Sequence, residues 1–298
     1  MKPDGAALLR MMPAVFVLIW STGFVAARFG MPHAPPLGFL SLRYALSILA
    51  FVVWVAWARA AWPQGRAQWL HLSVVGVLMH AGYLGGVWVA VKGGLGAGLV
   101  ALLVGLQPLL TALWVSATGS EHRVTGRHWL GLALGLAGLV LVVGHKMQLG
   151  EASLPNVAAG LFALLCITAG TLYQKRWVQP CDVRTANTVQ LMAALAVTLP
   201  LALLEDGTVQ MHPELVGAMV WSVLVLTLGG SSLLYLLIQR GAATAVTSLM
   251  YLVPPTTALM AWVLFDETLS ASVLAGLGLA AAGVALVVRT PAANKETT

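Results

Sequence analysis

The chain is a succession of long apolar runs, and the short segments between them carry nearly all of its charge. A helix needs ~20 apolar residues to cross the ~30 Å hydrocarbon core of a bilayer. Hydrophobic residues make up 59% of the chain and charged residues only 9%, whereas about a quarter of a soluble domain is charged. The sequence therefore predicts an all-α polytopic membrane protein embedded in the lipid bilayer. Its ten transmembrane helices are expected near residues 12–30, 37–57, 69–91, 95–116, 127–144, 155–175, 184–204, 214–237, 242–264 and 270–288.

The basic residues predict the direction in which the chain crosses the membrane. The net charge of +6 would suit a nucleic-acid partner, but the basic residues form short clusters between apolar runs, so no nucleic-acid partner is expected. With the N-terminus inside, the outer segments hold only Arg28, Lys92 and Lys146. The cytoplasmic segments then hold Lys2, Arg10, Arg59, Arg66, Arg123, Arg127, Lys175, Arg176, Arg184, Arg240, Arg289 and Lys295. Because Lys and Arg concentrate on the cytoplasmic side, both termini are expected there.

The second half of the sequence resembles the first at an offset of 147 positions. Because each half contains five spans, which is an odd number, the second half would enter the membrane upside down. The prediction is two inverted five-helix repeats, residues 1–147 and 148–298, an arrangement that many secondary transporters use. The matching pairs are Gly23 with Gly170, Gly82 with Gly229, Trp88 with Tyr235, Gly94 with Gly241, and Pro108 with Pro255.

Proline interrupts the fourth and ninth spans at equivalent places, Pro108 in one and Pro254 and Pro255 in the other. Proline inside a span frees a carbonyl and kinks the helix, which is tolerated where neighbours or a water-filled cavity satisfy the backbone. Gln107 lies beside the first of these prolines. The symmetric placement predicts two kinks around a shared centre. The alternative is that proline is simply frequent in transmembrane helices.

Polar residues inside the spans are few, and a charge at that depth is costly and usually functional. Arg43 lies in the second span and His80 near the middle of the third, whereas no Asp or Glu is embedded in any span. Gln190 occupies the position equivalent to Arg43 in the second half. Polar and aromatic residues at helical spacing complete the predicted cavity lining, which comprises Trp20, Arg43, His80, Tyr83, Gln107, Gln190, Ser231 and Tyr251.

Structural roles are the alternatives to these assignments. His80 could bond a neighbouring carbonyl, Arg43 could reach the membrane surface along its apolar stem, and the aromatic residues could be ordinary helix packing. The fifth and tenth spans carry glycines but no deep polar side chain, and small residues let helices approach closely. These two spans are interpreted as scaffold or as the face of a weak homodimer, and otherwise the protein is expected to be a monomer.

The sequence offers little support for an enzyme. It contains no buried pair of aspartates, no metal-spaced His/Cys cluster and no phosphate-binding glycine loop. Neither catalysis nor a cofactor nor a bound metal is therefore expected. A channel is compatible with an inverted repeat, but the small set of polar groups suits a bound solute better.

The early motif "WSTGF" (20–24), the two five-span repeats, and the proline-containing fourth and ninth spans followed by Glu121 and Glu267 resemble the drug/metabolite transporter superfamily. Within it the chain is similar to the EamA-type proteins, and among these to the YddG-like exporters of aromatic amino acids. The resemblance implies an exporter of the bacterial inner membrane with a central cavity between the repeats. Amphipathic drugs or other metabolites are the alternative solutes. Because no Asp or Glu is embedded in a span, the expected mechanism is facilitated diffusion, or at most proton coupling through His80.

Overall fold

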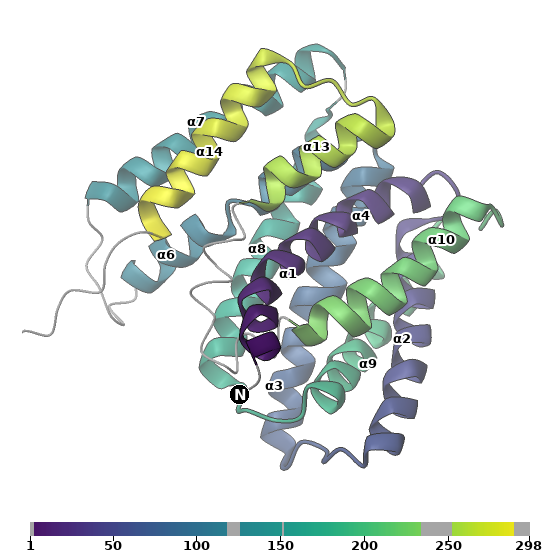
Figure 1. Ribbon diagram of the computed structural model, residues 1–298. Coiled ribbons are helices and arrows are strands. Elements are labelled where there is room, and N and C mark those ends of the chain that lie inside the picture. Colours follow the sequence, from purple (N-terminus) through teal and green to yellow (C-terminus); the bar gives the residue numbers. More distant parts are fainter. Residues whose placement is uncertain (1–2, 118–125, 151, 234–251, 289–298) are drawn as a thin grey trace, which may run out of the picture.

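The structure is a computed structural model that describes residues 3–117, 126–150, 152–233 and 252–288. Within these ranges every regular element is helical (Figure 1). The first half comprises α1 (Pro3–Gly30), α2 (Pro36–Ala58), α3 (Arg66–Gly76), η1 (Val77–Leu84), α4 (Gly85–Lys92), α5 (Ala97–Val104), α6 (Gln107–Ala117) and α7 (Gly126–Gln148). The second half comprises α8 (Leu154–Trp177), α9 (Val183–Ala202), α10 (Pro213–Trp221), η2 (Ser222–Ser231), α13 (Val253–Phe265) and α14 (Ala271–Val288).

Two π-helices occupy equivalent positions in the two halves. The segment η1 continues α3 into α4, and η2 continues α10. Shifting η1 by the sequence offset places it on residues 224–231, which lie inside η2. π-helices are rare and are frequently found at functional sites. The occurrence of this rare helix type at matching positions of both halves is consistent with a protein built from two similar repeats.

Six helices in the described part of the chain are long and apolar enough to cross a membrane. They contain α2, α3 to α4 through η1, α7, α8, α9, and α10 with η2. Four shorter apolar helices fall within the remaining predicted spans, at Val15–Gly30, Ala97–Thr111, Val253–Phe265 and Ala271–Leu286. The protein is thus a multi-pass helical membrane protein, and the number of ten crossings remains a prediction.

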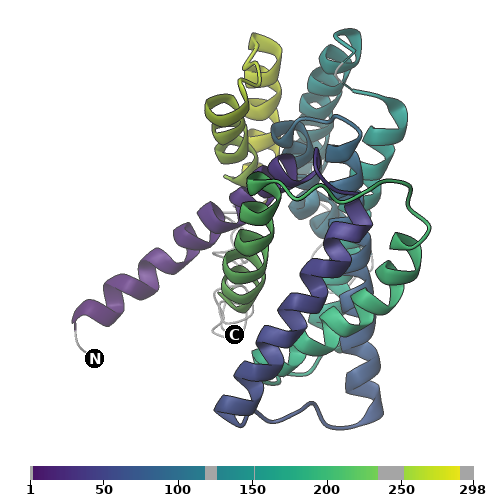
Figure 2. The ribbon, with the colours of Figure 1, turned by 90° about the vertical axis from the view of Figure 1, so that its right-hand side faces the viewer.

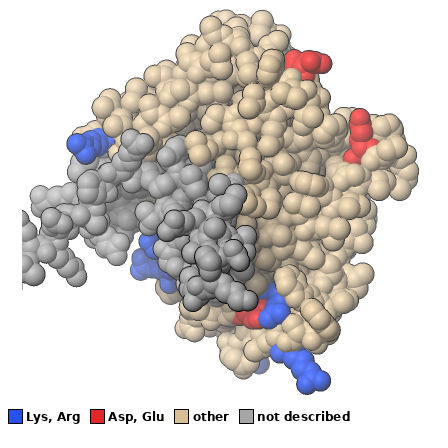
Figure 3. Space-filling view, in the orientation of Figure 1, with Lys and Arg blue, Asp and Glu red and all other residues tan. Residues whose placement is uncertain are grey.

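The outer surface of the bundle is apolar, as contact with lipid requires. Large side chains on several helices are more than half exposed, among them Leu49, Phe162 and Leu165. In Figure 3 most of the visible face carries no charged residue, and the acidic and basic side chains lie near its margins. Figure 2 shows the N-terminal part of α1 projecting away from the other helices.

Glycines bring α7 and α14 into backbone contact, and the two helices lie side by side in Figure 1. A Cβ atom added to Gly276 would lie 2.7 Å from the carbonyl oxygen of Gly138, and one on Gly138 would lie 2.5 Å from the carbonyl oxygen of Gly276. Real Cβ atoms do not approach oxygen this closely, so only glycine allows this packing. The interpretation of these two spans as scaffold therefore fits the structure.

The prolines stand where helices begin. The helix of the fourth span is interrupted at Gly105 and Leu106, and Pro108 is the second residue of α6. Pro254 and Pro255 lie in the first turn of α13. Backbone N–H groups in the first turn have no acceptor within the helix, so proline, which lacks an N–H, costs no helical hydrogen bond there. A Cβ on Gly105 would lie 2.5 Å from Cγ of Pro254. The two proline segments therefore meet at a glycine.

Acidic side chains of the second half cap helices of the first. The Glu205 carboxylate accepts hydrogen bonds from the backbone N–H groups of Leu37 and Gly38 at 2.9 Å each. Glu267 likewise accepts from the N–H of Ala97 at 2.9 Å. Free N–H groups and the positive end of the helix dipole favour a carboxylate at these positions. The two acids thus tie the halves together.

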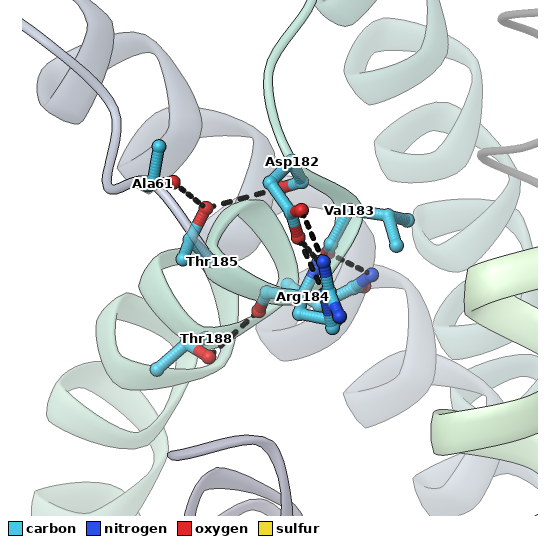
Figure 4. Close-up of polar contacts among 7 residues, drawn as sticks. Ala61, Asp182, Val183, Arg184, Thr185 and Thr188 are labelled. Carbon is cyan, nitrogen blue, oxygen red and sulfur yellow. Dashed lines mark hydrogen bonds and ion pairs between the residues drawn. The ribbon is translucent and has the colours of Figure 1, made fainter. Parts of the chain in front are cut away.

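At the opposite end of the bundle, Asp182 begins α9 (Figure 4). Its carboxylate accepts from the backbone N–H of Arg184 at 2.9 Å and from the guanidinium of the same residue at 2.6 Å. The Thr185 hydroxyl donates to the carbonyl of Ala61 at 3.0 Å, which links the start of α9 to the loop after α2. The Arg184 guanidinium holds the pKa of the Asp182 carboxyl below its ordinary value.

We expect Asp182→Asn to lower the thermal unfolding midpoint of the purified protein modestly at neutral pH. Asparagine still caps the helix, so the loss reflects the charge interaction with Arg184, which at this exposure is worth about 1 kcal/mol or less. A depressed carboxyl pKa stabilises the fold above the ordinary carboxyl pKa, and that contribution is lost as pH falls through the folded value. The difference in unfolding midpoint between Asp182→Asn and the parent should therefore disappear at acidic pH. Asp206→Asn, on an exposed loop, is the control; a gap that persists unchanged in acid would contradict the assignment.

A cavity between the two halves

A cavity of about 870 Å³, counted out to its open mouth, lies in the middle of the bundle. Helices of both halves contribute to it: α1, α2, η1 and α4 from the first, and α8, α9 and η2 from the second. The described residues that line it are Trp20, Gly23, Phe24, Arg43, Met79, His80, Tyr83, Leu84, Val87, Trp88, Gln174, Asn187, Gln190, Leu226 and Ser231.

Most of the residues predicted from the sequence meet in this cavity. They are Trp20, Arg43, His80, Tyr83, Gln190 and Ser231. Gln107 does not line it; its side chain on α6 donates to the Thr171 hydroxyl on α8 at 2.9 Å. Tyr251 lies outside the described residues. The sequence reasoning overlooked Gln174, which lies one helical turn beyond the repeat-matched Gly170 and could have been found from that spacing.

Arg43 is buried, with 6% of its surface exposed. Its Nε and Nη2 donate to the Thr227 hydroxyl oxygen at 3.1 and 3.0 Å. The Thr227 hydroxyl itself donates to the carbonyl of Ser222 at 2.8 Å, which is a five-residue spacing within η2. The π-helix therefore orients Thr227 to hold the guanidinium. The Arg43 guanidinium is thus held inside the bundle.

The guanidinium keeps hydrogen-bonding capacity beyond Thr227. Arginine has five N–H donors in a planar fork, and Thr227 is its hydrogen-bond acceptor among the described residues. Arg43 also lines the cavity. It is the single permanently charged residue in the described lining, which contains no carboxylate. The described wall of the cavity thus carries a positive charge at Arg43.

The repeat offset relates two polar pairs in the cavity. Arg43 corresponds to Gln190, and His80 corresponds to Thr227. Arg43 bonds Thr227 in one pair, while the Gln190 side chain lies beside the His80 ring in the other. The two halves therefore place similar polar groups at similar depths but differ in charge. One side of the cavity is cationic, and the equivalent position on the other side holds a neutral amide.

Aromatic rings form much of the remaining wall. Trp20 stacks on Tyr83 with centroids 6.5 Å apart and an interplanar angle of 5°. Trp88 stacks on Phe39 at 4.4 Å. The Tyr44 hydroxyl donates to the carbonyl of His80 at 2.8 Å, which satisfies a backbone group within η1. Such walls accommodate a flat apolar group beside the buried cation.

The two halves pack against each other at the end of the bundle where α1 stops and α10 starts. We call this the outer end, because the basic residues predict that it faces away from the cytoplasm. A Cβ on Gly30 would lie 3.3 Å from Phe39, 3.4 Å from Trp88 and 3.5 Å from Ala218, so both halves pack tightly here. In the other direction the lining extends to Gln174, near the end of α8.

A helical membrane protein whose two like halves enclose a central cavity with a few polar side chains in its wall has the architecture of a membrane transporter. The profile of the EamA-like transporter family matches residues 10–144 and again residues 155–289. The chain belongs to this family. The double match also gives the two-repeat organisation independent support.

Curated relatives are similar over nearly their whole length. A "Probable amino-acid metabolite efflux pump" of Salmonella typhimurium is 24% identical over 278 residues, covering 90% of each chain. The "Uncharacterized inner membrane transporter YedA" of Escherichia coli K12 is 26% identical over 285 residues, covering 94% of this chain and 91% of its own. A crystal structure with 19% identity superposes with a TM-score of 0.66 over 93% of this chain and 96% of its own. That structural likeness concerns the fold alone.

Proposed function

We propose that this transporter exports amino acids, in particular those with aromatic or other apolar side chains, across the bacterial inner membrane. The observation that carries the proposal is the buried guanidinium of Arg43 in the wall of a cavity that also contains aromatic residues. A guanidinium pairs well with a carboxylate, and Trp20 and Tyr83 suit the side chain of the same solute. The printed name of the Salmonella relative points to the same class of solute.

Efflux of cationic drugs is the alternative within transporters, and the charge of the cavity argues against it. A cationic solute requires a buried carboxylate or a cage of aromatic faces without a competing cation. The described lining has no carboxylate and already contains Arg43. An anionic or zwitterionic solute is therefore favoured by charge.

We further propose that all ten apolar segments cross the membrane as two inverted repeats, with both termini in the cytoplasm. The matching π-helices and proline segments support the repeat. The halves also pack against each other at the outer end, where Gly30 lies close to Ala218. Alternating access would then require α1 to separate from α10 at the outer end while the other end closes. A permanently open channel would not need its halves to pack and separate in this way.

A flux panel tests the proposed function. Purified protein in liposomes should transport aromatic amino acids faster than charged ones, with aliphatic ones between, and protein-free liposomes provide the background. Fast transport of cationic drugs together with absent amino-acid flux would overturn the assignment in favour of the alternative.

Transport is expected to be independent of sodium, because sodium sites in spans usually rest on an embedded carboxylate. Uptake into proteoliposomes should proceed equally with sodium or potassium outside. An imposed proton gradient should either have no effect or act through His80, in which case His80→Ala abolishes the gradient effect and keeps downhill exchange. Sodium-driven accumulation would refute the claim, and proton-driven accumulation surviving in His80→Ala would exclude His80.

A further inference from the structure

Three metal-binding side chains converge at the outer end, away from the cavity. His33 follows α1, and His212 and Glu214 stand at the start of α10. His33 Nε2 lies 3.0 Å from Oε2 of Glu214, and His212 Nδ1 lies 3.8 Å from the same oxygen. The two imidazole rings stack with centroids 4.1 Å apart. One ligand atom from each residue falls within 4.8 Å of the others.

The backbone around these side chains is held in place. The N–H of Gln210 donates to the carbonyl of His33 at 2.8 Å, which joins the loop after α1 to the loop before α10. Glu205, in the same loop as Gln210, caps the start of α2. The side chain of His33 is 16% exposed, and those of His212 and Glu214 are about half exposed. The cluster is thus preorganised yet open to solvent.

We propose that His33, His212 and Glu214 bind a divalent cation of the zinc class. Zinc is bound by nitrogen and carboxylate ligands at ~2.0–2.2 Å in tetrahedral geometry, which separates the ligand atoms by roughly 3.4 Å. The observed separations of 3.0 and 3.8 Å lie on either side of that value. His212 Nδ1 accepts the N–H of Glu214 at 3.3 Å, so an ion bound at this nitrogen would displace that hydrogen bond from its lone pair. Two imidazoles select zinc over magnesium or calcium, and water can fill the fourth position.

A bound ion would join the two halves of the protein. His33 comes from the first half, and His212 and Glu214 come from the second. The cluster stands at the outer end, where Gly30 of α1 lies close to Ala218 of α10. The ion therefore holds α1 against α10, the same helices that separate when the cavity opens outward. This step rests on the proposed function, whereas zinc binding itself does not.

Binding is measured on the purified full chain after removal of any histidine tag, by titrating Zn²⁺ in competition with a chromophoric chelator at neutral pH. The parent should bind zinc with an affinity that excess Mg²⁺ does not change. His33→Ala and His212→Ala should each weaken zinc binding at least about tenfold. Mutating even a residue that only hydrogen-bonds to a metal ligand lowers metal affinity or activity about 10- to 100-fold. Glu214→Gln keeps the size of the side chain and should also weaken binding. His145→Ala, a histidine of α7 outside the cluster, is the matched control.

Two further results decide the proposal. Zinc should raise the thermal unfolding midpoint of the parent but not that of His33→Ala, and it should slow amino-acid flux in the parent alone. Equal zinc affinity in parent and variants would overturn the site. Undiminished flux at saturating zinc would overturn the link between α1 and α10. If no amino acid is transported at all, the proposed function fails while the binding result still stands.

Discussion

Replacing Arg43 with Gln should reduce amino-acid flux about 10- to 100-fold while leaving the protein folded. Hydrogen bonds to charged groups contribute about 1.5–3 kcal/mol, and each 1.4 kcal/mol is a factor of ten. Glutamine is the residue that the second half carries at the equivalent position 190, so the fold accommodates it at this depth. Arg43→Lys should also be impaired, because an ammonium lacks the planar fork that matches a carboxylate. Initial rates in proteoliposomes at several concentrations measure the effect.

The amides of the same amino acids provide the control for this prediction. They keep the side chain and the amino group but lack the carboxylate, so their slower basal flux should change little between parent and Arg43→Gln. Thr227→Val removes the acceptor that orients the guanidinium and should give an intermediate loss. Parental flux of the free amino acids in Arg43→Gln would show that the carboxylate is recognised elsewhere.

Membrane insertion and the repeat were predictable from the sequence because both depend on local features. Apolar runs of sufficient length have few alternatives to a spanning helix. Arg43 and His80 were found because polar groups in a span are costly, which makes them conspicuous. Both of them line the cavity. The double family match likewise agrees with a sequence built from two repeats.

The missing parts of the site depend on tertiary structure. Apolar periodicity does not distinguish a π-helix from an α-helix, so the geometry that aligns Thr227 with Arg43 left no trace in the pattern. The sequence around Trp88 does not distinguish it from a lipid-facing tryptophan, yet its side chain is buried, with 1% of the residue exposed. Gln107 satisfies every sequence criterion but bonds Thr171. His33 and Glu214 lie 181 positions apart, and only the packing of α1 on α10 brings them together.

A leucine at position 276 should severely lower the yield and thermal stability of the protein. The Cβ of the new residue would lie 2.7 Å from the backbone of Gly138 and against the Val142 side chain, so α7 and α14 would have to separate along their contact. Overpacking costs 1–3 kcal/mol where side chains can adjust, and a carbonyl oxygen cannot move aside as a side chain does. We therefore expect a loss at or above about 3 kcal/mol, measured as the midpoint of thermal unfolding in detergent.

The matched control is Gly278→Leu, two positions along the same helix. Gly278 is exposed, and a Cβ there would meet no atom within 4 Å. The lipid-facing leucine should therefore leave stability near that of the parent. The comparison also separates the two interpretations of the glycine-rich helices. If they serve as the scaffold joining the two halves, Gly276→Leu is the damaging change. If α14 instead forms a homodimer through its exposed face, Gly278→Leu disrupts association in a crosslinking or light-scattering measurement while the monomer stays folded.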